Sequence, residues 1–502
     1  MNKVLKGLVA VVSTAAMAIA GFAGAASATA AGTNYDITVP STDTHTYSVY
    51  QVFTGDLSNG TLSNIKAGHN FNTNNEKGKS AADAAAEIAQ NTSADTDNTA
   101  RLAAITPYVD LTATAFGEVS ARASLSAPAG YYLLKDKDAV TGDDAATLFI
   151  VQVNGPVTVN RKADKPSFEK KVQDVNDSTG DKSGWQDSAD YDVNDDVPFQ
   201  LTATLPSDAN DFAAYKTYKL VFHDNQSAGL TFKPETVVVK YEGTTLNTES
   251  YTLDQNPTDG HTFDITISNA KSVKDTDGAP ITVANGGKFT VEYKSTLNAN
   301  AEIGSKGNPN EASLEFSNNP NVGGEGNTGK TPTDKVIVFT YQLDINKTFN
   351  GGTPDDSDLP EFTLYKFDST TNDYTTNLGK MNITKTADGK YTASFKRVDD
   401  GKYKLVETKT PAGFNTAADT TFEITADHDV TSIDPKLTSL KINSTDGDTT
   451  TGTVVADVVN QKGSNLPSTG GMGTTILYAA GAAIVLVAAF GIAFAVRRRN
   501  AR

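Results

Sequence analysis

Three polar residues end apolar stripes in the last third of the chain: Lys347, Glu407 and Asn460. In a β-strand, residues i, i+2 and i+4 share one face, so each stripe predicts a strand whose inward face ends in a polar side chain. The apolar members of the stripes are Tyr341, Leu343 and Ile345, then Tyr403 and Leu405, then Val454, Ala456 and Val458. A single lysine or glutamate of this kind usually only extends into water or bonds a turn. The three residue types together predict a shared buried site.

This combination of side chains allows a specific condensation. Burial disfavours charge, so it lowers the pKa of a lysine and raises the pKa of a glutamate. The neutral amine of Lys347 is then a nucleophile beside the carboxamide of Asn460. A protonated Glu407 can polarise the amide oxygen and relay a proton to the leaving ammonia. The predicted product is a Lys–Asn isopeptide bond, a permanent crosslink that needs no oxidant.

A second set of the same kind lies in the middle third of the chain. Its polar members are Lys170, Asp224 and Asn318, which alternate with Phe168 and Val172, with Tyr218, Leu220 and Phe222, and with Leu314 and Phe316, respectively. Parity favours Lys170 and Asn318, but a slip of one residue in register would substitute Lys171 and Asn319. Asp195 and Asp196 are alternatives to Asp224, because they also lie near a predicted strand start. The first third shows no comparable set.

The elements that must position these residues are strands. Short runs rich in Val, Thr, Tyr and Phe recur between Gly, Asn and Asp clusters, which is typical of antiparallel β-sandwiches. An Ala-rich segment, Ser80–Ile105, predicts one or two surface helices inserted in the first domain. Linkers rich in Gly, Thr and Pro divide the exported chain into predicted domains 31–162, 163–333 and 334–465.

Both ends of the chain predict export. Residues 1–30 combine Lys3 and Lys6 with an apolar run and small residues before a cleavage site, which is typical of a secretory signal peptide. Near the other end, an apolar run at 476–496 has the length of a membrane span, and arginines follow it. Upstream of that run stands a pentapeptide, Leu466-Pro467-Ser468-Thr469-Gly470. Pentapeptide, apolar run and basic tail of residues 466–502 together resemble the sorting signal of sortase substrates. The resemblance implies cleavage between Thr469 and Gly470 and transfer of the Thr469 carbonyl to an amine.

The segment Gly401–Phe414 contains the residues YKLVETKTPAGF. It resembles the E-box of pilins, with Phe414 in place of the usual Tyr. Residues 334–465 are therefore similar to a CnaB-type isopeptide domain of a major (backbone) pilin from Gram-positive sortase-assembled pili. The resemblance implies a mainly β chain of tandem Ig-like CnaA- and CnaB-type sandwiches. It also implies that Glu407 catalyses formation of the Lys347–Asn460 bond.

The middle domain resembles the same family at His223–Leu230 and at Ser317–Pro320. The implied bond there is Lys170–Asn318, with Asp224 as the acid. Backbone pilins carry an acceptor lysine in a pattern like VxVYPK at the end of the first domain. Here the stretch is Val157-Thr158-Val159-Asn160-Arg161-Lys162, which makes Lys162 the expected acceptor and Lys165 its alternative.

The resemblance implies a structural shaft subunit rather than an enzyme. Its implied partners are other copies of itself, a pilus-specific class C sortase, a housekeeping sortase with peptidoglycan, and minor tip and base pilins. The resulting cell-surface pilus would support adhesion to a host or glycan ligand that the sequence does not identify. The alternative is a singly wall-anchored adhesin that uses the same domains as a stalk.

Composition narrows the possible ligands. The 502 residues include no cysteine, so disulfides and cysteine-based zinc sites are excluded. Loss of both ends removes six basic residues and no acid, which moves the net charge from −17 to −23 and argues against nucleic acid as a partner. Five histidines are dispersed and predict no metal cluster. Asp174–Gly180 resembles a calcium loop, but its Gly comes one place late and the closing Glu is missing. No metal or other cofactor is predicted.

Overall fold

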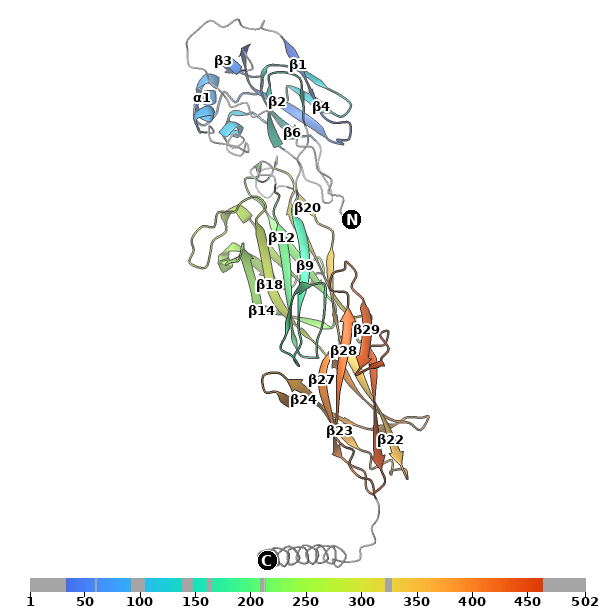
Figure 1. The fold of residues 1–502 in the computed structure, drawn as a ribbon. Coiled ribbons are helices and arrows are strands. Elements are labelled where there is room, and N and C mark those ends of the chain that lie inside the picture. The colour runs from blue at the N-terminus through green and yellow to red at the C-terminus, as the bar shows by residue number, and fades with distance from the viewer. Residues whose placement is uncertain are drawn as a thin grey trace, which may run out of the picture.

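The computed structural model describes residues 33–58, 61–91, 104–137, 148–159, 165–207, 212, 214–320 and 327–463. Three β-rich domains follow one another along an elongated molecule (Figure 1). The predicted mainly β fold of tandem domains is confirmed. The predicted signal peptide and sorting signal lie outside the described ranges. Within those ranges, no helix combines the length and the apolar character needed to cross a membrane.

The first domain contains two sheets, with strand orders β5-β1-β8 and β3-β2-β6-β7, and β4 pairs with β2. Its core between the sheets includes Ile37, Val49 and Leu134. The elements of this domain are β1 (Asn34–Thr38), β2 (Thr46–Ser58), β3 (Thr61–Ala67), α1 (Ala81–Asn91), η1 (Thr106–Tyr108), β4 (Gly117–Ser120), β5 (Leu125–Pro128), β6 (Gly130–Asp136), β7 (Leu148–Val153) and β8 (Val157–Thr158).

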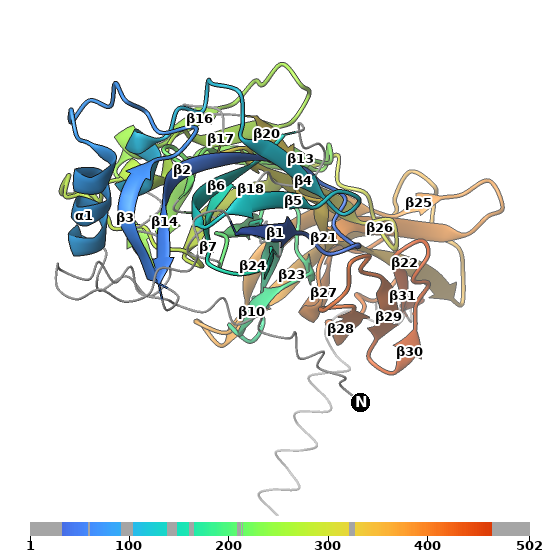
Figure 2. The ribbon, with the colours of Figure 1, turned by 90° about the horizontal axis from the view of Figure 1, so that it is seen from above.

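The predicted helical insertion is confirmed as α1, which lies beside β3 (Figure 2). Ser80 precedes the helix, and its hydroxyl accepts a hydrogen bond of 3.2 Å from the Asp83 backbone N–H, which satisfies a donor that the first turn leaves free. Ala84 and Ile88 are buried in a second core, on the face of the five-stranded sheet turned away from the three-stranded one. The helix is therefore held by packing of its apolar face.

The middle domain is a sandwich of two larger sheets, with strand orders β10-β9-β12-β18-β14-β15 and β11-β21-β19-β13-β17-β16. In addition, β20 pairs with β19. The elements are β9 (Ser167–Val175), β10 (Lys182–Gln186), β11 (Ser188–Asp190), β12 (Asp196–Thr204), β13 (Leu220–Gln226), β14 (Leu230–Tyr241), β15 (Thr244–Thr245), η2 (Thr248–Ser250), β16 (Thr252–Asp254), β17 (Phe263–Ile267), η3 (Ala270–Ser272), β18 (Lys288–Leu297), β19 (Asn308–Ser317), β20 (Thr328–Lys330) and β21 (Asp334–Phe339).

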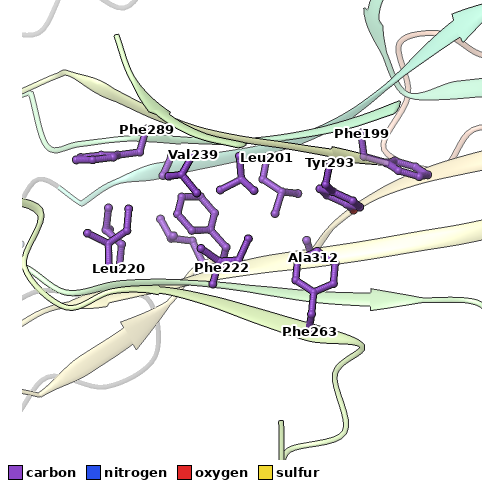
Figure 3. Packing of buried hydrophobic residues seen from close by; sticks show 14 of the residues in the cluster. Phe199, Leu201, Leu220, Phe222, Val239, Phe263, Phe289, Tyr293 and Ala312 are labelled. Carbon is purple, nitrogen blue, oxygen red and sulfur yellow. The ribbon is translucent and has the colours of Figure 1, made fainter. Parts of the chain in front are cut away.

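Alternating side chains of the two sheets fill the space between them, as expected for a sandwich (Figure 3). Phe199, Leu201 and Tyr293 extend from one sheet, and Phe222 and Ala312 extend from the other. All five are at most 3% exposed. The buried polar residues of the middle domain, Lys170 and Asp224, lie within this apolar interior.

The last domain pairs a four-stranded sheet, β25-β26-β22-β31, with a six-stranded sheet, β24-β23-β27-β28-β29-β30. One core fills the space between them and includes Leu343, Leu405 and Val458. The strands are β22 (Tyr341–Asn350), β23 (Glu361–Asp368), β24 (Asp373–Asn382), β25 (Thr384–Lys385), β26 (Tyr391–Val398), β27 (Gly401–Lys409), β28 (Thr420–His428), β29 (Leu437–Ile442), β30 (Thr445–Asp446) and β31 (Thr453–Gln461).

Strand β21 corrects the predicted boundary between the last two domains at 333/334. It pairs with β19 and β11 and so belongs to the middle domain. Val336 and Val338 are buried in the core of the middle domain, whereas Ile337 and Phe339 belong to the core of the last domain. The two cores thus share one strand, and the change of domain falls near Thr340.

A buried ion cluster joins the same two domains. Lys366, from the last domain, has a fully buried ammonium. Its Nζ lies 2.7 Å from the Asp192 carboxylate of the middle domain, 2.6 Å from the Asp399 carboxylate and 3.2 Å from that of Asp177. Burial alone would lower the pKa of this lysine, but the surrounding carboxylates raise it well above its ordinary value. The cluster therefore holds a permanent cation at the domain interface.

The segment that resembles a calcium loop also contacts the last domain. Asn176 donates a 2.6 Å hydrogen bond to the Asp400 carboxylate, and the Ser178 hydroxyl accepts a 2.8 Å bond from the Lys402 backbone N–H. Because side chains of this segment bond the neighbouring domain, they fix the angle between the two domains.

We predict that Lys366→Met destabilises this interface strongly. Loss of the ammonium leaves buried carboxylates without their cation, which typically costs about 3–5 kcal/mol. Denaturant unfolding should show this loss against Lys390→Met, where a lysine paired to Asp388 at the surface contributes at most about 1 kcal/mol. Equal unfolding midpoints for the two variants would contradict a stabilising role for the cluster.

Candidate isopeptide sites

The strands of the last domain place its three polar residues on their inward faces, as the alternation predicts. Lys347 is on β22, Glu407 on β27 and Asn460 on β31, and each is at most 6% exposed. The alternating apolar residues of each stripe are buried with them. Because β22 and β31 are neighbours in one sheet and β27 belongs to the other, the set bridges the sandwich.

Glu407 and Asn460 are in direct contact. The Asn460 Nδ2 donates to Oε1 and Oε2 of Glu407 at 3.0 and 2.9 Å, and to the Asn415 carbonyl at 2.6 Å. The Ala417 backbone N–H donates a 2.5 Å bond to Glu407 Oε2. The Asn460 Oδ1 is buried without a hydrogen-bond partner. The nitrogen that would leave is thus held by the acid that would protonate it, and the carbonyl oxygen remains unpaired.

Lys347 approaches this pair along the parallel ladder. Lys347 is aligned with Val458, and Asn460 is aligned with Phe349, so the lysine and the asparagine are two ladder positions apart on one face. Its Nζ donates to the Thr348 and Val458 carbonyls at 2.7 and 3.3 Å and lies 4.3 Å from the centre of the Phe349 ring. Burial lowers the pKa of Lys347 to about 8, and the negative charge of Glu407 opposes this only in part.

In the middle domain, Lys170 and Asp224 form a fully buried pair. Their Nζ and Oδ2 atoms are 2.5 Å apart. Tyr293 completes a triangle: its hydroxyl accepts from Lys170 at 2.8 Å and donates to Asp224 Oδ2 at 2.6 Å. Burial lowers the pKa of Lys170, although Asp224 opposes the shift. Burial, and then the nearby Asp224, raise the pKa of Tyr293 well above its ordinary value, so the phenol keeps its proton.

The asparagine at this site is Asn310, which corrects the predicted Lys170–Asn318 pair. Asn310 Nδ2 donates a 2.9 Å hydrogen bond to the Tyr293 hydroxyl. In the register of β13 with β19, Asp224 is opposite Ala312. Asn318 is six residues further along the chain, about 20 Å at the usual rise per strand residue. Asn318 is buried, but its carboxamide is too far from Lys170 to react with it.

The remaining candidate residues of the middle domain lie away from this site. Lys171 faces the opposite side of β9 and pairs with Asp187 at 2.6 Å. Asp196 pairs with Lys233 at 2.7 Å near the surface. Asp195 lies at the interface with the last domain, beside Asp192, and Asn319 directly follows Asn318. The alternation of inward and outward residues therefore selected Lys170 and Asp224, which are in contact.

Sequence reasoning missed Tyr293 and Asn310. Tyr293 belongs to one of the short runs rich in Val, Thr, Tyr and Phe, at Phe289–Tyr293, and nothing else in the sequence distinguishes it. Asn310 has the same parity as Asn318, and it lies in the alternating run that begins at Asn308 and continues through Leu314 and Phe316. The position of each asparagine along its strand could have identified Asn310. In the antiparallel pair, the first inward residues of β19 lie opposite the last inward residues of β13.

The residues expected to join subunits lie mostly outside the described part of the chain. Leu466, Pro467, Ser468, Thr469 and Gly470 are not described, and neither is Lys162. The alternative acceptor, Lys165, is exposed just before β9. The choice between the two lysines stays a prediction.

Two segments of the chain match known families. Residues 458–501 match the LPXTG cell wall anchor motif, and residues 359–437 match the prealbumin-like fold domain. The second match includes Glu407 and ends before Asn460. The chain is thus a cell-wall-anchored surface protein of a Gram-positive bacterium.

Similar proteins were also found along most of the chain. The trypsin-resistant surface T6 protein of Streptococcus pyogenes serotype M6 is 27% identical over 416 residues, which cover 68% of this chain and 70% of that protein. The structure of the T6 backbone pilin of the same serotype superimposes with a TM-score of 0.48 at 20% identity, covering 86% of this chain and 98% of the other. The major pilin SpaD of Corynebacterium diphtheriae gives 0.44 at 18% identity, with 86% and 97% covered. The predicted resemblance to backbone pilins is confirmed.

We predict that the Lys347 amine titrates near pH 8 when its bond cannot form. In the variant Asn460→Ala, the lysine remains free and buried, so its ammonium loses a proton more readily than an exposed one does. Lysine side-chain NMR shifts should give a midpoint of about 8 for Lys347 and about 10.4 for an exposed lysine. A midpoint above 10 for Lys347 would contradict the reactive amine.

Proposed function

We propose that this chain is the shaft subunit of a covalent cell-surface pilus, with two autocatalytic isopeptide bonds inside each subunit. The observation that carries the proposal is the combination of a wall-anchor signal with two buried lysine–acid–asparagine sets. The relationship to the T6 surface protein supports it. The anchor supplies a C-terminal acyl donor, and the buried sets supply domains suited to carry tension.

In the last domain, the bond forms between Lys347 and Asn460. The neutral amine attacks the Asn460 side-chain carbonyl carbon, and Glu407 takes a proton from the attacking amine and passes it to the nitrogen that leaves as ammonia. One C–N bond forms, one C–N bond breaks, and no electron is transferred. Contact between Glu407 and the leaving nitrogen supports this role for the acid.

In the middle domain, the corresponding partners are Lys170 and Asn310. Asp224 takes a proton from the Lys170 ammonium, and the neutral amine attacks the Asn310 side-chain carbonyl carbon. As the new C–N bond forms, the amine gives up a second proton, and the amide nitrogen leaves with both protons as ammonium. Tyr293 is a positioning residue: its hydroxyl contacts the lysine, the acid and the asparagine at once. This network supports Asn310, rather than Asn318, as the acceptor of the Lys170 amine.

Subunits are joined by a pilus-specific class C sortase. The enzyme cuts after Thr469, and Lys162 of the next subunit attacks the Thr469 carbonyl, with Lys165 as the alternative nucleophile. A housekeeping sortase transfers the basal end of the polymer to peptidoglycan. Minor pilins occupy the tip and the base of the pilus. No residue of the shaft subunit is assigned to the adhesion ligand.

Intact mass tests the intramolecular bonds. We expect a protein of residues 31–465 to be lighter than its sequence by two ammonia molecules. Asn310→Ala should restore one of them, and Asn460→Ala the other. Asn318→Ala is the matched control and should still lose both. Restoration of one ammonia by Asn318→Ala, with none by Asn310→Ala, would reverse the assignment.

Polymerisation tests the function itself. Cell-wall extracts of the native organism should give a high-mass ladder on a denaturing gel, and Lys162→Ala should reduce the ladder to monomer. Lys165→Ala is the control, and loss of the ladder in that variant alone would move the acceptor to Lys165. A single monomer band from unmodified cells would favour the singly anchored adhesin.

A further inference from the structure

Two histidines and two aspartates meet on the outer surface of the middle domain. His223 directly precedes Asp224 on β13, so its side chain points to the opposite face of the sheet, away from the Lys170 site. His223 is opposite Asp264 in the register of β13 with β17. Asp259 and His261 belong to the turn that leads into β17. Strand pairing thus gathers residues that the sequence presents as dispersed.

The atoms of this cluster have the spacing of metal ligands. His223 Nδ1 is 2.8 Å from Asp264 Oδ1 and 3.7 Å from Asp259 Oδ2. His261 Nδ1 is 3.0 Å from Asp259 Oδ2 and 3.3 Å from Asp264 Oδ1. Ligands about 2.0–2.2 Å from a tetrahedral ion are about 3.3–3.6 Å apart. The four ligand atoms all lie within 4.8 Å of one another, so small side-chain rotations suffice to place them around one ion.

The His261 ring adds a second observation. Its Nδ1 is buried and makes no hydrogen bond, although two carboxylate oxygens lie within 3.3 Å. The nitrogen is therefore directed between the carboxylates rather than along a hydrogen bond to either. The centres of the His223 and His261 rings are 4.6 Å apart, an approach that disfavours a positive charge on both. A single cation between the four atoms would compensate both carboxylates.

Glu315 fixes the tautomer of His223. Its Oε2 is 3.4 Å from His223 Nε2. A carboxylate oxygen accepts hydrogen bonds, so the Nε2 that faces Glu315 carries the ring proton. This tautomer leaves Nδ1 facing Asp264 and the cluster. A carboxylate behind a histidine in this way is the usual support of a metal ligand.

We propose that His223, Asp259, His261 and Asp264 form a zinc site on the outer face of the middle domain, supported by Glu315. Two imidazoles and two carboxylates suit Zn²⁺ better than the oxygen-only preference of Ca²⁺ or Mg²⁺. The ion replaces the proton between His223 and Asp264. The Asp259 side chain is 41% exposed, so an ion can enter from solvent.

Calorimetric titration tests the site directly. Residues 31–465 contain every described sheet and core, and this protein, purified without a histidine tag, should bind one equivalent of Zn²⁺. His261→Ala and Asp259→Asn lie in an accessible turn, and each should weaken binding at least about 100-fold. Glu315→Gln should weaken binding about 10-fold. Co²⁺ should give the intense visible absorption of a tetrahedral ion.

The matched control is His69→Ala, an exposed histidine of the first domain, which should bind Zn²⁺ like the unmodified protein. Circular dichroism verifies that each variant is folded. Absence of saturable uptake would overturn the proposal. Unchanged affinity in both His261→Ala and Asp259→Asn, or a preference for Ca²⁺ over Zn²⁺, would overturn it as well.

Discussion

The cost of burying a lysine ammonium is the constraint on which this structure depends. Three lysines, Lys170, Lys347 and Lys366, are at most 1% exposed. Lys366 is surrounded by carboxylates that raise its pKa, so it remains a cation and joins two domains. Burial lowers the pKa of the other two, because Lys170 has one carboxylate in contact and Lys347 is bonded to carbonyl groups. The direction of the pKa shift therefore distinguishes Lys366, which stays charged, from Lys170 and Lys347, whose neutral amines can form amide bonds.

The positions of the two proposed bonds determine which part of the chain carries force. A Lys170–Asn310 bond lets tension pass from β9 directly to β19, and a Lys347–Asn460 bond lets it pass from β22 to β31. Residues 171–309 and 348–459 then lie outside the load path. Between the two bonds, tension runs through β20 and β21, and β21 is held by both cores. The shared strand and the Lys366 cluster therefore strengthen the segment that the proposed crosslinks leave unprotected.

Short strand-like runs were sufficient to predict the fold class, an Ala-rich segment predicted the helical insertion, and local alternation predicted the inward faces of the strands. It placed Lys347, Glu407 and Asn460 on inward faces because each of them ends an apolar stripe. It could not separate Asn310 from Asn318, since both have the same parity and differ only in their position along one strand. That difference depends on pairing between β13 and β19, which are about 90 residues apart and whose register no local pattern fixes.

The same limit explains why the histidine cluster was missed. His223 and Asp264 become neighbours only through the register of β13 with β17, and Glu315 joins them from β19. Successive residues of β13 thus serve two purposes: Asp224 faces inward to the Lys170 site, and His223 faces outward to the cluster. The cluster lies within residues 171–309, which the proposed Lys170–Asn310 bond removes from the load path. Its geometry can therefore persist while the subunit is under tension.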